Sequence, residues 1–63
     1  MNVVLPDKSK IELVDGSTVA DLAKKISEGL YKRAIAAKVN GNIVDLSYKL
    51  NENDEVTILT DKD

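Results

Sequence analysis

The sequence predicts an α+β domain in which a mixed sheet of four or five strands packs on one main helix. Two observations indicate this class: β-forming runs occupy both ends of the chain, and one amphipathic helical stretch lies between them. The 63-residue chain carries a formal net charge of −2. A chain of this length buries only about 60% of the surface that its unfolded form exposes, so it builds one small core. We therefore expect a single domain over residues 1–63.

Two β-forming runs open the chain, at residues 2–5 and 10–14. Residues 6–9 between them read Pro-Asp-Lys-Ser, of which Pro, Asp and Ser are turn formers, so the two runs are predicted to pair as a hairpin. In the second run Ile11 and Leu13 alternate with charged residues. This period of two is typical of a strand with one buried face.

A helix is predicted to begin at Val19. Thr18 precedes it and Asp21 follows three residues later, which is a shortened form of the capping box. The apolar positions form one helical stripe: Val19, Leu22, Ala23 and Ile26. Gly29 is predicted to end the helix in the left-handed conformation, after about ten residues. Because so short a helix is marginal alone in water, its stripe must pack on the sheet.

A second hairpin is predicted around Asn40-Gly41, whose residues suit the two positive φ angles of a type I′ turn. The turn joins a strand over Ala34 to Val39 to a returning strand at residues 42–44. A two-residue loop fixes the register, so Ala37 is expected opposite Val44.

The last strand is predicted over residues 55–60. It has apolar side chains on both faces, which predicts a central strand beside the first one. A hairpin, a crossing helix, a second hairpin and a central final strand together give the β-grasp, or ubiquitin-like, architecture.

The composition argues against most enzyme classes. The chain has no histidine and no cysteine, so it lacks the commonest metal ligand, the commonest general base and any thiolate. Turn and cap roles explain its serines and threonines, most of its carboxylates fall at predicted turns or exposed helix positions, and its three glycines form no phosphate-binding array. We therefore assign no catalytic, cofactor-binding or metal-binding residue. With no long apolar run, the sequence predicts no membrane span and fits a reducing cytoplasm.

Basic residues concentrate in the middle of the chain, where a single acid accompanies them. The candidate contact residues are Lys24, Lys25, Lys32, Arg33 and Lys38. They are either the solvated face of a small domain or a surface that contacts phosphate groups or a neighbouring acidic domain. With only two tyrosines in the chain, any nucleic-acid contact is expected to involve the phosphates.

Five segments in this order and spacing resemble the TGS domain, a β-grasp module shared by threonyl-tRNA synthetases, certain GTPases and guanosine-polyphosphate enzymes. They are Leu5-Pro6-Asp7, Thr18-Val19-Ala20-Asp21-Leu22-Ala23, Ala37-Lys38-Val39-Asn40-Gly41, Val44-Asp45-Leu46 and Val56-Thr57-Ile58-Leu59-Thr60. Many relatives have glycine where this chain has Lys8 and Asn53. Lys8 is therefore expected either to hold a positive φ at some cost or to change the turn type.

The first strand begins directly after Met1, as in bacterial threonyl-tRNA synthetases, so the resemblance implies an amino-terminal, monomeric and non-catalytic fragment of such an enzyme. The parent would join threonine to its tRNA with ATP and magnesium and hold a zinc ion, all in later domains, while the fragment itself carries no cofactor. The five candidate residues would contact tRNA phosphates or neighbouring domains. The alternatives are a regulatory module of a GTPase or guanosine-polyphosphate enzyme, or a free-standing β-grasp adaptor. A sulfur carrier would need a Gly-Gly terminus, whereas this chain ends in Asp-Lys-Asp.

Overall fold

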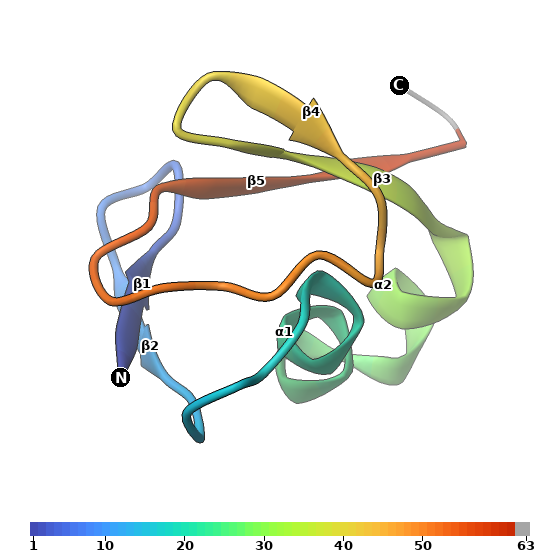
Figure 1. Cartoon of the computed structure of the whole chain (residues 1–63). Coiled ribbons are helices and arrows are strands. Elements are labelled where there is room, and N and C mark those ends of the chain that lie inside the picture. The colour runs from blue at the N-terminus through green and yellow to red at the C-terminus, as the bar shows by residue number, and fades with distance from the viewer. Residues whose placement is uncertain (62–63) are drawn as a thin grey trace.

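A three-stranded sheet lies on one side of the two helices, and the first hairpin stands beside both (Figure 1). The computed structural model describes residues 1–61. The elements are β1 (Asn2–Val4), β2 (Lys10–Glu12), α1 (Val19–Ile26), α2 (Glu28–Arg33), β3 (Ala34–Val39), β4 (Asn42–Val44) and β5 (Val56–Thr60). The predicted α+β class is therefore confirmed.

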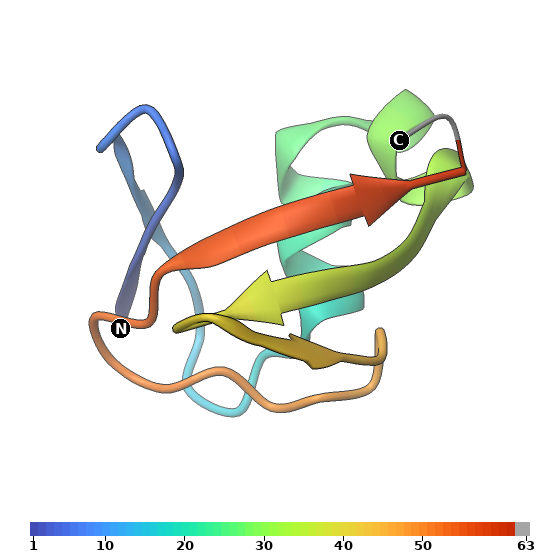
Figure 2. The ribbon, with the colours of Figure 1, turned by 90° about the horizontal axis from the view of Figure 1, so that it is seen from above.

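The strands form two sheets where the sequence predicts one. β1 pairs with β2, and the second sheet has the order β4-β3-β5, with every pairing antiparallel. A single parallel bridge, between Val4 and Glu55, joins them, and the Val4 N–H donates to the Asp54 carbonyl at 2.8 Å. Beyond that bridge β1 and β5 diverge (Figure 2). The prediction of a central final strand is therefore wrong, because β3 is the central strand and β5 lies at the edge of its sheet, linked to β1 through this bridge alone within residues 1–61.

The residues after β1 explain why the pairing stops. The Leu5 N–H donates to the Ser9 carbonyl at 2.9 Å, and the Leu5 carbonyl accepts from the Lys8 N–H at 2.8 Å. Pro6 has no N–H to donate. The backbone groups that would continue a ladder to β5 are therefore used inside the β1–β2 turn or absent.

The second hairpin agrees with its prediction in turn and register. Asn40 has a φ of 51° and Gly41 a φ of 89°. Ala37 lies opposite Val44, and Val39 lies opposite Asn42. The turn conformation thus sets which side chains of β3 and β4 face the helices.

Helix α1 begins at Val19, as predicted, with both halves of the capping box present. The Asp21 N–H donates to Thr18 Oγ1 at 3.3 Å, and the Thr18 N–H donates to Asp21 Oδ2 at 2.9 Å. These bonds satisfy two backbone donors at the helix start, one of which would otherwise lack a partner within the helix.

The predicted end of the helix at Gly29 is wrong, because α1 ends at Ile26 and Gly29 lies inside α2. Ser27, in extended conformation with a φ of −171°, is the boundary between the two helices. Its N–H donates to the Ala23 carbonyl, and its Oγ accepts from the Leu30 N–H at 3.0 Å. Since one serine caps both helices, the chain turns without a left-handed glycine.

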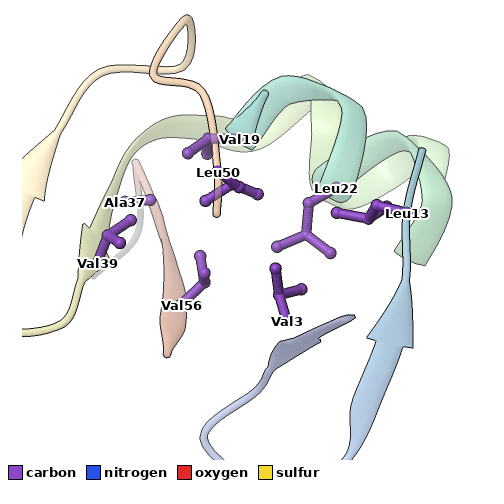
Figure 3. Close-up of a cluster of buried hydrophobic side chains, with 8 residues drawn as sticks. All are labelled: Val3, Leu13, Val19, Leu22, Ala37, Val39, Leu50 and Val56. Atoms are coloured by element: carbon purple, nitrogen blue, oxygen red, sulfur yellow. The ribbon is translucent and has the colours of Figure 1, made fainter. Parts of the chain in front are cut away.

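The core lies between the helices and the two sheets, and strands, helix and connecting segments all contribute to it. Its buried members are Val3, Leu13, Val19, Leu22, Ala37, Val39, Leu50 and Val56. In Figure 3, Leu22 of α1 points toward Val3 of β1 near the centre of the cluster. Ile26, which the sequence places on the apolar stripe, is 38% exposed at the end of α1.

A buried carboxylate fastens the β3–β4 turn to the segment before β5. Asp54 is only 6% exposed, and its carboxylate accepts from Asn40 Nδ2 at 2.9 Å and from the Asn51 N–H at 2.8 Å. Asn40 Oδ1 in turn accepts from the Glu55 N–H at 2.9 Å. Asn40 therefore supplies both the turn conformation and a link between two segments that lie far apart in the sequence.

Asn40→Asp should destabilise the fold at neutral pH, because it keeps a turn-compatible residue but replaces the donor to Asp54 with a second carboxylate. We expect a loss of about 1–3 kcal/mol in the free energy of unfolding, measured by urea denaturation. The two neighbouring carboxylates repel each other, so stability should recover as the pH falls and one of them takes up a proton, and it should be lost again as the pH rises. Asn42→Asp, on exposed β4, is the charge-matched control. An equal loss in both variants would contradict the proposed link.

Three aspartates have lowered pKa values because hydrogen bonds hold their carboxylates ionised. The Ser9 hydroxyl, 2.6 Å away, is the main cause of the lowered pKa of Asp7, and the Ser47 hydroxyl, 2.7 Å away, has the same effect on the pKa of Asp45. For Asp21 the Thr18 N–H is the main cause of the lowered pKa. All three are turn or cap groups on the surface.

Asp21→Asn should reduce stability at neutral pH. The difference in stability between the variant and the native chain should become smaller in acid. A lowered folded-state pKa stabilises the fold above the unfolded value of about 4, and this contribution disappears as the pH falls through the lowered pKa. Thermal unfolding between about pH 7 and pH 3 measures this difference. Asp61→Asn, which removes the same charge after β5, controls for net charge. A difference that stays constant through the acid range would contradict this role for Asp21.

Lys8→Gly should raise the free energy of unfolding by about 0.5–1 kcal/mol, because glycine adopts a positive φ without strain. Lys8 has a φ of 71° and Asn53 a φ of 66°, the two positions where many relatives have glycine. Lys10→Gly, in the extended strand β2, is the matched control and should lower stability. Chemical denaturation of both variants tests this, and a loss at Lys8 would show that its side chain stabilises the turn.

Candidate functional site

The five basic residues predicted as a contact surface lie on two separate parts of the molecule. Lys24 and Lys25 are in the last turn of α1, and Lys32 and Arg33 are in the last turn of α2. Lys38 is on β3, where the residues on both sides of it in the chain are buried in the core. Because side chains alternate along a strand, Lys38 points away from the helices.

The lysines of α1 already have partners within the chain. Lys25 Nζ donates to the Glu12 carbonyl at 2.8 Å, which ties α1 to β2. Lys24 Nζ lies 4.6 Å from the centre of the Tyr31 ring, a cation–π contact with α2. These two lysines therefore help to hold α1 against α2 and β2.

Lys38 faces a cleft of about 550 Å³ between the β1–β2 turn and β5. Two further lysines, Lys8 and Lys10, also line it, so we call it the lysine cleft. Its walls include Leu5 and Pro6, and Glu55 is its acidic residue. Val4 and Glu55, which form the bridge between the two sheets, both line the cleft. Figure 2 shows that β1 and β5 diverge beyond this bridge.

Strand pairing brings the three lysines of the cleft together. Lys10 lies opposite Val4 on the β1–β2 hairpin, next to the bridge with β5, and Lys38 lies opposite Thr57 of β5. Lys8 is added by the turn with its positive φ. Lys8 and Lys10 are not among the contact residues predicted from the sequence. Two signals could have placed them near Lys38. One is the alternation of apolar and charged side chains in β2, and the other is the expectation that β1 and β5 lie side by side.

The ammonium groups of the lysine cleft have no hydrogen-bond or ion-pair partner within residues 1–61, in contrast to those of Lys24 and Lys25. All three side chains belong to exposed residues. The arrangement is a mixed cleft in which positive charge exceeds negative charge. Chemically, it can attract an anion but holds no nucleophile–base pair.

The outer face of the three-stranded sheet also exposes apolar side chains. Ile43 of β4 lies opposite Lys38 and is 71% exposed, and Ile35 at the start of β3 is 61% exposed. A bulge in the β3–β5 pairing surrounds Ile35. No described helix or loop covers this side of the sheet (Figure 1).

The described part of the chain offers no candidate for two other kinds of site. Residues 1–61 contain no cluster of three or more side chains of the metal-ligating types histidine, cysteine, aspartate and glutamate. Over the same residues, no helix is long and apolar enough to cross a membrane.

Comparison with known proteins identifies the family. The family model of the TGS domain matches residues 1–60. The chain is 50% identical over 62 residues to a threonine–tRNA ligase of Pelobacter propionicus, 47% over 62 residues to that of Lactobacillus helveticus and 48% over 63 residues to that of Herminiimonas arsenicoxydans. These alignments cover 98%, 98% and 100% of this chain.

The same alignments cover only 10% of each ligase, so the chain spans about a tenth of the length of these curated relatives. TGS domains have the β-grasp fold, which confirms the architecture expected from the strand and helix order. The match over residues 1–60 shows that this chain belongs to the TGS domain family.

Proposed function

We propose that this chain is the non-catalytic TGS module of a threonine–tRNA ligase. The supporting observation is its 46–50% identity, over nearly the whole chain, to proteins of that name. The parent would join threonine to its tRNA in the cytoplasm, using ATP. The sites for ATP, magnesium and zinc would lie in later domains, and the module itself would add contacts to the rest of the assembly.

Two surfaces of the module suit such contacts. The exposed lysines could attract the phosphates of a tRNA, and the uncovered sheet face with Ile35 and Ile43 could pack on a neighbouring domain of the parent. A regulatory module of a GTPase or guanosine-polyphosphate enzyme is the alternative that the family alone leaves open. The names of the relatives favour the ligase.

The native polypeptide that carries this sequence should be about ten times as long as the chain, because its relatives are. Intact-mass measurement of the protein captured from its source would show this, and the captured protein should attach threonine to tRNA. Deleting residues 1–61 from it should leave threonyl-adenylate formation intact and raise the KM for tRNA. A captured protein that hydrolyses GTP or makes guanosine polyphosphates, and does not charge tRNA, would refute the proposal.

A further inference from the structure

We propose that the lysine cleft binds the phosphodiester backbone of RNA. Lys8, Lys10 and Lys38 would contact the phosphates, while Leu5 and Pro6 form an apolar wall against the riboses. The inference rests on the proposed function for one point only, which is that RNA is the polyanion that the parent handles.

The state of the lysines favours this cleft over the two lysines at the end of α1. Lys24 is engaged with the Tyr31 ring and Lys25 with the Glu12 carbonyl, so binding a phosphate there competes with contacts inside the chain. The three ammonium groups of the cleft have no such partner within residues 1–61. A phosphate arriving at the cleft therefore displaces only water and counterions.

The lining of the cleft points to backbone contact rather than to base recognition. No aromatic residue lines it among the described residues, so bases have no platform on which to stack. Its polar side chains are three lysines, Thr57 and Glu55. Cations of this kind hold phosphates and fix the position of a strand without reading its sequence.

An acidic peptide is the other polyanion that positive charge could attract, but β1 offers it no backbone groups with which to pair. A peptide strand gains affinity by pairing with free backbone groups at a sheet edge. On the β1 side, the Val4 N–H is bonded to the Asp54 carbonyl, Leu5 uses both its backbone groups in the turn, and Pro6 has no N–H. RNA needs only the ammonium groups, and it is the polyanion that the proposed parent handles, so we commit to RNA.

Glu55 provides a variant that should improve binding. Its backbone is fixed, because its N–H donates to Asn40 Oδ1 and its carbonyl accepts from the Asn40 N–H, both at 2.9 Å. Its side chain is the carboxylate at the cleft and opposes a phosphate. Glu55→Gln should therefore tighten RNA binding, and a gain of affinity cannot arise from unfolding.

The test is a titration of the isotope-labelled 63-residue chain with a single-stranded RNA dodecamer, followed by backbone amide shifts at several salt concentrations. We expect shifts around the lysine cleft and a slope of log K against log salt of about −2, since each phosphate contact contributes about −0.7. Lys10→Gln and Lys38→Gln should each make the slope shallower by about 0.7, with native-like spectra elsewhere. Lys49→Gln, which removes an exposed lysine outside the cleft, should leave it unchanged.

Shifts confined to residues 24–33, or affinities that the cleft variants leave unchanged, would overturn the inference. So would a glutamate-rich peptide of equal charge that binds the cleft more tightly than the RNA, because the partner would then be a protein. These outcomes are separate from the tRNA-charging assay on the long parent. A parent that charges tRNA while its chain shows no RNA contact at the cleft would refute only this inference.

Discussion

The hydrogen bond between Asn40 and Asp54 is the interaction on which the arrangement of the strands depends. A buried carboxylate is costly unless it is fully hydrogen-bonded, and Asp54 meets this requirement only when the β3–β4 turn and the segment at residues 51–54 are both in place. The Asp54 carbonyl also accepts from Val4, so the same residue holds β1. One residue thus joins three segments that come from the start, middle and end of the chain.

The lysine cleft is a direct consequence of that junction. Asp54 and the Val4–Glu55 bridge hold β1 against the start of β5, and the chain then turns away at Pro6, whose missing N–H ends the pairing. The two sheets therefore meet at one point and separate beyond it. The space between them is lined by side chains from outer strand faces, where charged residues are expected.

The lysines of α1 and the lysines of the cleft have different surroundings. Lys24 and Lys25 contact an aromatic ring and a backbone carbonyl, and so tie α1 to α2 and to β2. Lys10 and Lys38 extend from strands whose other face packs on the core, and their ammonium groups have no partner among residues 1–61, so they can bind an external anion. Charge counted along the sequence does not distinguish these surroundings, because it ignores which groups already have a partner.

Local signals determined much of this fold: the positive φ of Asn40 and Gly41, the cap of Thr18 and Asp21, and the register of β3 with β4 each depend on neighbours a few residues away. At the end of α1 two local signals compete, the serine at position 27 and the glycine at position 29. The sequence alone placed the helix end at Gly29, whereas in the structure Ser27 ends α1 and caps α2. Only the tertiary structure decided the burial of Asp54 and the meeting of distant lysines at one cleft. Both depend on pairing between β1 and β5, at opposite ends of the chain, and no local pattern specifies how far such a pairing extends.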